Sequence, residues 1–134
     1  MDQQQSDVLA FHKKYGCLYN EKPTIIAPEI LLLRSRLIIE EAAEFVRAAS
    51  QNDMVGMADA ITDLLYVTYG AAVCLGVDIE PCFNEVQKSN MTKDGGGKDS
   101  AGKIKKGPDF REPDLLSILT KQGWADATKF TPAR

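Results

Sequence analysis

The chain of 134 residues has little of several features that mark common classes of protein. Three cysteines, an odd number without a CxxC pair, and a single histidine argue against a disulfide framework and a cysteine-type zinc site, and they favour a reducing cytoplasm. No apolar run approaches the roughly 20 residues of a membrane span, and the polar start MDQQQSDV is unlike a secretory signal. There is no basic excess, with 16 Lys+Arg against 19 Asp+Glu. We therefore expect neither a membrane nor a nucleic acid as partner.

Strand patterns are also scarce, whereas helical patterns are strong. Helices are predicted over residues 2–15, 28–50, 53–76, 78–89 and 113–122. Asp53 and Asp78 are suitable N-caps, and Gly16, Gly76 and Gly123 are suitable stops. Residues 90–111 form a lysine- and glycine-rich loop, and residues 123–134 are an uninformative tail. We expect a single all-α domain over residues 1–134, with its core at about 2–122 and its second and third helices antiparallel.

Acidic residues interrupt the apolar faces of these two long helices. On the second helix, Glu40 and Glu44 lie within roughly 80° of Leu37, and Glu41 lies at the edge of the same stripe. On the third helix, two acids one turn apart share a stripe with several apolar residues, and the whole set is Val55, Asp59, Asp63, Tyr66, Gly70 and Val73. Five carboxylates are therefore predicted to face the interior of the bundle.

Carboxylates that face an interior repel one another and lose hydration, so a cation has to compensate them. The arginines of the second helix are too few, because Arg36 and Arg47 lie near its rim. Hard oxygen donors without a nearby His or Cys suit Mg²⁺, or Mn²⁺, better than Zn²⁺. His12 is expected at the surface or boundary of another helix. The simpler interpretation is that the acids lie on helix faces that are exposed to solvent. It is less favoured because two acidic sets occur on consecutive antiparallel helices.

These residues resemble the all-α nucleoside triphosphate pyrophosphohydrolases, the MazG-like and phosphoribosyl-ATP pyrophosphohydrolase-like superfamily. That family has EExxE on one helix and ExxD on the next; residues 40–44 match the first part, and Asp63 matches the aspartate of the second. Ala60 stands where the second motif has a glutamate, and Asp59 is the obvious substitute. Residues 58–70, Ser89–Lys93, Gly102-Lys103 and Lys106–Pro108 extend the resemblance to one branch of that superfamily.

The resemblance implies a MazG-like four-helix bundle with a long Gly/Lys-rich loop, completed by oligomerisation as a homodimer or homotetramer. It implies Mg²⁺-dependent hydrolysis of a nucleoside triphosphate, of noncanonical or excess kind, between the α and β phosphates. The expected metal ligands are Glu41, Glu44, Asp59 and Asp63. Glu40 is expected to polarise the attacking water, directly or by holding a further ion, and Glu41 counts with it as catalytic.

The phosphates of the substrate need cationic partners, which the loop can supply. The expected substrate-binding residues there are Asn90, Lys93, Lys103 and Lys106, whereas Lys98 and Lys105 read as solvated. Tyr66 fills the core or stacks on a base, with the core favoured, and Phe11 and Tyr15 are further candidates for the wall of the nucleotide pocket.

Two other functions compete with hydrolysis at this stage. A catalytically silent nucleotide- or metal-binding helical module is favoured by Ala60. A helical oligomerisation domain, whose acids pair with arginines, is the third possibility. A P-loop enzyme is excluded, because no Gly-x-x-x-x-Gly-Lys-Ser/Thr run occurs.

Overall fold

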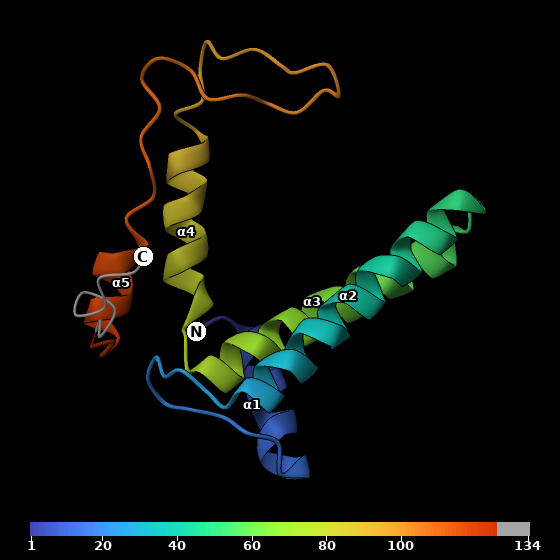
Figure 1. Ribbon diagram of the computed structural model, residues 1–134, viewed down its shortest axis with the longest axis vertical. Coiled ribbons are helices and arrows are strands. Elements are labelled where there is room, and N and C mark those ends of the chain that lie inside the picture. Colours follow the sequence, from blue (N-terminus) through green and yellow to red (C-terminus); the bar gives the residue numbers. More distant parts are fainter. Residues whose placement is uncertain (126–134) are drawn as a thin grey trace. The chain divides into compact units, whose positions relative to one another are not determined.

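A computed structural model describes residues 1–125, and their regular structure is helical (Figure 1). The helices are α1 (Gln3–Tyr15), α2 (Pro28–Ser50), α3 (Met54–Leu75), α4 (Ile79–Asn90) and α5 (Leu115–Lys121). Within residues 1–125 no β-strand forms, and a single isolated bridge joins Lys98 to Ile104. The all-α prediction is confirmed. Most of the predicted tail, residues 126–134, lies outside the described residues.

The chain divides into two compact units, Met1–Ile79 and Glu80 onward, which are described separately below. The prediction of a single domain stays a prediction. The first unit contains α1, α2 and α3, and the second contains α4, the lysine- and glycine-rich segment and α5.

A tight turn makes α2 and α3 antiparallel neighbours, which lie side by side along their length (Figure 1). The turn ends at Asp53, whose side chain accepts a hydrogen bond from the Gly56 amide (3.0 Å) and so caps α3. The seam near this turn is built from small residues. Ala48 and Ala60 are buried, and a Cβ atom placed on Gly56 would lie 3.1 Å from that of Ala48. Small side chains therefore let the two helix backbones approach closely here.

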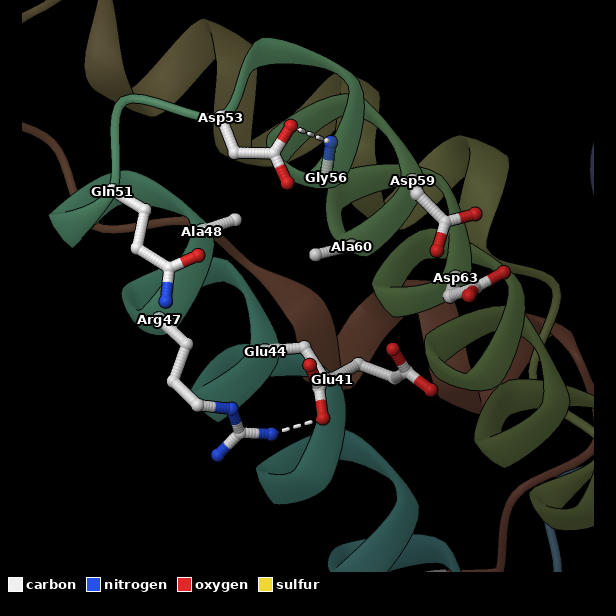
Figure 2. Close-up of a pocket in the computed structure, with 10 residues that line it drawn as sticks. All are labelled: Glu41, Glu44, Arg47, Ala48, Gln51, Asp53, Gly56, Asp59, Ala60 and Asp63. Atoms are coloured by element: carbon white, nitrogen blue, oxygen red, sulfur yellow. Dashed lines mark hydrogen bonds and ion pairs between the residues drawn. The ribbon is translucent and has the colours of Figure 1, made fainter.

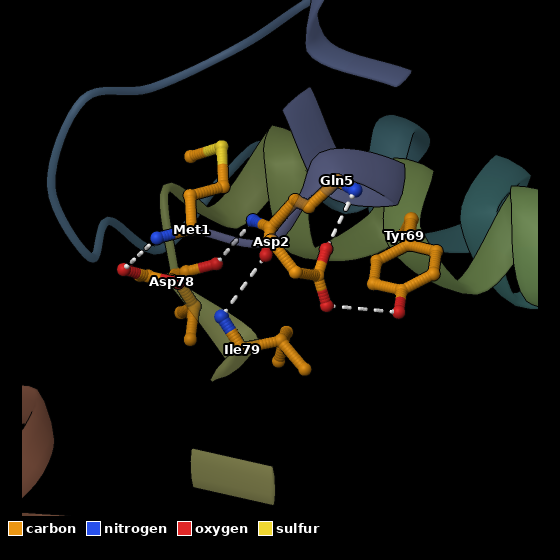
Figure 3. Close-up of polar contacts among 7 residues, drawn as sticks. Met1, Asp2, Gln5, Tyr69, Asp78 and Ile79 are labelled. Atoms are coloured by element: carbon orange, nitrogen blue, oxygen red, sulfur yellow. Dashed lines mark hydrogen bonds and ion pairs between the residues drawn. The ribbon is translucent and has the colours of Figure 1, made fainter. Parts of the chain in front are cut away.

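The helix α1 packs on α3 and is fixed at both ends. Asp2 caps its first turn, and Gly16 ends it in the left-handed conformation (φ +69°). The buried Gln5 side chain donates to the Val77 carbonyl (2.7 Å) and accepts from the Ile79 amide (3.0 Å), so it binds the segment that follows α3 (Figure 3).

The prediction that His12 lies at the surface or boundary is wrong, because its side chain is 2% exposed. Its Nδ1 lies 2.8 Å from the Leu18 carbonyl oxygen, which can only accept, so Nδ1 carries the proton. The Nε2 atom lies near Gly70, 3.3 Å from where a Cβ of that residue would be. Nη1 of Arg34 lies 2.8 Å from the same point. Gly70 is thus the place where side chains from α1 and α2 meet α3.

The helix α3 is long and apolar enough to cross a membrane by length and composition, with a mean hydropathy of 1.3 over its best window. One such helix is weak evidence, since the core helix of a soluble protein passes the same test. Two aspartates lie on one face of α3, and the helix packs against α1 and α2.

Large apolar side chains remain uncovered on α2 and α3. Val55 is 80% exposed, and Ile39 and Val46 are each 66% exposed. The prediction that Val55 faces a neighbouring helix is therefore wrong for this chain alone. The reason is that the main contacts of α3 within residues 1–125 are with α1 and α2, which leave one side of the helix pair open.

The second unit is tied together by side-chain hydrogen bonds to its backbone. The buried Ser89 hydroxyl donates to the Arg111 carbonyl (2.7 Å), and the Asp114 amide donates to the Glu85 carboxylate (3.1 Å). These contacts hold the segment that connects the loop to α5 against α4.

Candidate metal and phosphate site

A cleft of about 450 Å³ lies between α2 and α3 (Figure 2). Five carboxylates line it, and four of them are the predicted metal ligands: Glu41, Glu44, Asp59 and Asp63. Regular helix geometry explains the arrangement, because residues three and four apart share a face and the antiparallel pairing sets the two faces against each other. The structure therefore brings the predicted ligands to one place.

The charges in this cleft influence one another. The pKa of Glu41 is raised above its ordinary value of 4.5, first by loss of hydration and then by the charge of Asp63. The carboxylates of Glu44, Asp59 and Glu40 raise it further, in that order. A raised carboxyl pKa means that the ionised group is disfavoured until a proton or another cation compensates it.

The predicted burial of the acids is wrong in part. Glu40, Glu44 and Asp59 are exposed, while Glu41 and Asp63 are half-buried, because the open side of the helix pair leaves the cleft in contact with solvent. Glu40 does not line the cleft, although its charge reaches Glu41. The assignment of Glu40 to the attacking water stays a prediction.

Three polar residues of the cleft did not figure in the predicted site. Arg47 forms an ion pair with Glu44 and lies at the rim, where its position on α2 had placed it (Figure 2). Gln51 and Asp53, from the connecting turn, close one end of the cleft. Turn residues carry no helical periodicity, so only the capping signal of Asp53 could have pointed to them.

The donor chemistry of the cleft fits a hard divalent cation, since all five acids that line it offer carboxylate oxygens. Among residues 1–125, however, no three His, Cys, Asp or Glu side chains stand in the arrangement of a ready-made metal site. The side chains of the cleft would have to turn toward an ion to coordinate it. Exposed carboxylates on two rigid helices have the rotamer freedom to do so.

The departure from the family motif is accommodated inside the cleft. Ala60 is 2% exposed and forms part of the seam between α2 and α3. Asp59 precedes it, lines the same cleft and contributes to the raised pKa of Glu41. The carboxylate that Ala60 lacks is thus present one residue earlier.

The predicted phosphate-binding residues belong to the second unit. Asn90 ends α4, and Lys93 is half-buried. Lys103 and Lys106 are exposed, but Lys106 already pairs with Glu112 (3.2 Å) and lies over the Phe110 ring. Lys106 would have to leave this pair to bind a phosphate.

Within the predicted lysine- and glycine-rich loop, a small hairpin forms around the isolated bridge between Lys98 and Ile104. Backbone hydrogen bonds join Lys105 to Gly97 (3.0 Å) and Asp99 to Lys103 (2.9 Å). A Cβ on Gly107 would lie 1.7 Å from the Asp94 carbonyl oxygen. The glycine at this point is required because two backbone segments cross.

Tyr66 lies outside the acidic cleft and is not a core residue, since it is 40% exposed. Its ring stands edge-on against Phe11, with centroids 5.7 Å apart, and Phe11 in turn contacts the Tyr15 ring. It lines a second hollow, between α1 and α3.

The sequence also matches known proteins. Residues 8–90, more than half of the chain, match the family described as "Phosphoribosyl-ATP pyrophosphohydrolase". A protein of Acanthamoeba polyphaga mimivirus, named "Uncharacterized protein L479", is 38% identical over 53 residues, which are 40% of this chain and 21% of that protein. The match thus spans about a fifth of the length of this curated relative.

The region that matches the family model includes both helices of the acidic cleft and most of α1. The chain therefore belongs to the phosphoribosyl-ATP pyrophosphohydrolase family, within the MazG-like superfamily of all-α nucleoside triphosphate pyrophosphohydrolases.

Proposed function

We propose that this chain hydrolyses nucleoside triphosphates, of noncanonical or excess kind, between the α and β phosphates. The products are a nucleoside monophosphate and pyrophosphate. The observation that carries the proposal is the gathering of Glu41, Glu44, Asp59 and Asp63 in one cleft, with the pKa of Glu41 raised by its acidic neighbours. Membership in a family of pyrophosphohydrolases supports it.

Mg²⁺, or Mn²⁺, is the proposed cofactor, in keeping with a family that is typically Mg²⁺-dependent. When bound, the ion supplies positive charge for the phosphate oxygens and makes water a better nucleophile. Glu41, Glu44, Asp59 and Asp63 would hold it. Glu40 is proposed to polarise the attacking water, directly or by holding a further ion.

Lys93, Lys103 and Lys106, with Asn90, are proposed to bind the phosphates, and Tyr66 is proposed to bind the base. Lysine ammonium groups can neutralise the negative charge of the phosphates, which carboxylates cannot do. A homodimer or homotetramer is proposed as the working form, supported by the exposed Val55, Ile39 and Val46. The reducing cytoplasm, favoured by the odd number of cysteines, is the proposed compartment.

The test is to incubate the purified protein with a panel of ribo- and deoxyribonucleoside triphosphates, with and without Mg²⁺, and to assay pyrophosphate and orthophosphate separately. Mg²⁺-dependent release of pyrophosphate is the expected result. Release of orthophosphate would reject the cleavage position, and no release from any nucleotide would reject the enzyme.

A catalytically silent nucleotide- or metal-binding module is the second candidate, favoured by Ala60 and by the need for the acids to reorient. Calorimetric titration with Mg²⁺ and Mn²⁺ distinguishes it. Ion binding without turnover supports this candidate, whereas turnover on the nucleotide panel excludes it.

A further inference from the structure

A second hollow, of about 370 Å³, lies between α1 and α3, and we call it the α1–α3 groove. Its volume falls in the range of about 300–1,000 Å³ that small-molecule pockets have. Val8 is its buried floor, and Leu65, Tyr66 and Tyr69 are its apolar walls. A mostly apolar hollow with a few polar groups at its edge is the usual form of a ligand site.

The two tyrosine rings of the groove are held in place by different contacts. The Tyr69 hydroxyl donates to the Asp2 carboxylate (3.2 Å), as Figure 3 shows, and partial burial together with this contact raises the pKa of Tyr69. Tyr66 packs perpendicular to the Phe11 ring, with the ring centroids 5.7 Å apart. Both therefore offer fixed aromatic surface to a flat ring.

Two polar groups of the groove have capacity left for a ligand. Oδ1 of Asp7 accepts a hydrogen bond from Gln3 (2.8 Å), which leaves Oδ2 without a donor among the described residues. The Gln4 amide lines the groove and makes no hydrogen bond within residues 1–125. The groove thus presents a carboxylate oxygen and an amide beside its aromatic walls.

Neighbouring residues of α3 line the groove and the acidic cleft. Tyr66 follows the cleft residue Asp63 by three positions, and residues three apart on a helix have Cβ atoms about 5–6 Å from each other. Thr62, the neighbour of Asp63, also lines the groove. A sugar is the part of a nucleotide that spans such a gap between a base and its α phosphate.

We infer that the α1–α3 groove binds the base of the nucleotide, and that the Asp7 carboxylate selects bases with an exocyclic amino group. A carboxylate oxygen can accept a hydrogen bond from an exocyclic amino group, as aspartate and glutamate do from N4 of cytosine. The imide N–H of uracil or thymine is flanked by two carbonyl oxygens, which repel a carboxylate. This inference rests on the proposed function, because it takes the phosphates of the same molecule to lie in the cleft.

The first experiment measures nucleosides, which lack phosphates, by calorimetry on the full chain. Adenosine and cytidine are expected to bind in the millimolar range, and uridine and thymidine about tenfold more weakly. Leu65→Trp fills the groove from a position that is 55% exposed, and it should abolish nucleoside binding while circular dichroism stays unchanged. Failure of adenosine and cytidine to bind the wild type up to about 10 mM would overturn the inference.

The second experiment compares kcat/KM for amino-bearing and imide triphosphates. Asp7→Asn should reduce the preference for cytidine over uridine triphosphate about tenfold, since an amide can also donate a hydrogen bond to a uracil carbonyl. Glu29→Gln, an exposed acid at the start of α2 outside both hollows, is the matched control and should change nothing.

The outcomes separate this inference from the proposed function. Hydrolysis with an unaltered base preference in Asp7→Asn would overturn the inference alone. Absence of any hydrolysis would overturn the proposed function, and the nucleoside titrations would then decide the groove by themselves. A change of oligomeric state in Leu65→Trp with unchanged nucleoside binding would assign the groove to a second copy of the chain and overturn the inference.

Discussion

The acidic cleft of the first unit and the lysine-bearing hairpin of the second are both charged, but they are held by different means. In the cleft, helix backbones set the positions, and the side chains of Glu44 and Asp59 remain exposed and able to turn. In the hairpin, backbone hydrogen bonds and glycine crossings set the positions, and Lys106 is already paired. The side chains of the first region can therefore reorient around a cation, whereas the second region must release contacts to bind an anion.

The largest effect is expected from the cleft itself. Glu41→Gln or Glu44→Gln should lower Mg²⁺-dependent pyrophosphate release by about 100-fold or more, because each removes a charged oxygen donor from the site. Steady-state assays check this, with Glu29→Gln as a control on the same helix. Activity within a few fold of wild type in both cleft variants would show that these acids do not serve the reaction.

The hairpin should be most sensitive at its backbone crossing. Gly107→Ala places a methyl group against the Asp94 carbonyl, so the two segments must separate. Hydrogen exchange at the amides of Asp99 and Lys105, which close the hairpin, should accelerate about tenfold or more.

The control for the crossing is Gly102→Asn. Gly102 has a φ of +87° with nothing within 4 Å of its missing Cβ, and Asn tolerates that conformation better than other residues. Its amide exchange should match the wild type. Equal exchange in the Gly107→Ala variant would mean that the hairpin does not depend on this close approach.

The lysines are expected to have a smaller effect on catalysis than the acids. Lys93→Gln, Lys103→Gln and Lys106→Gln should each raise KM for the triphosphate by about 3–10-fold with kcat little changed, because each removes one exposed or partly exposed charge. Lys98→Gln and Lys105→Gln, from the same hairpin, are the matched controls. A uniform effect of all five changes would indicate general attraction by charge and no specific phosphate contact.

The smallest effect concerns the stability of the metal-free protein. The pKa of Glu41 is raised in the folded state, so its ionised form destabilises the fold; stability is greater below pH 4.5 and is lost as the pH rises through the folded-state pKa. Glu41→Gln should therefore raise the Tm slightly at pH 7, and the gain should disappear at pH 4. Calorimetric scans in EDTA check this; a lower Tm at pH 7 would contradict it.

For Asp114, in the second unit, stability is expected to depend on pH in the opposite direction. Its pKa is lowered below 3.8, first by the Ser117 hydroxyl and then by the Ser117 amide, so its contribution is present above that value and is lost as the pH falls. Asp114→Asn should consequently lower the Tm at pH 7, and the two variants should converge toward the wild type in acid.

Helical regularity made much of this molecule predictable from its sequence. The boundaries of α2 and α3 followed from Pro28, the cap at Asp53 and the stop at Gly76, and the positions of the four cleft acids followed from helix periodicity. Periodicity could not tell how much of each face is covered, so the exposure of Val55 was not foreseen.

The features that sequence reasoning missed depend on contacts between distant segments. The burial of His12 needs the Leu18 carbonyl and the helix α3 beside it, and no local pattern reports either. The glycines of residues 90–111 indicated a loop, but they did not show that Gly107 is needed where the chain crosses itself. In both cases the residue type gave information, but the sequence did not identify the distant segment that the residue contacts.

The missing side chain at position 70 has a consequence for the α1–α3 groove. A methyl group there would meet the guanidinium of Arg34 and the imidazole of His12, one from each neighbouring helix. Displacing His12 would shift α1, which carries Gln4, Asp7 and Val8 of the groove. Mutations at Gly70 can therefore alter which base is accepted without changing any residue that lines the groove. A search for variants of altered selectivity should include position 70.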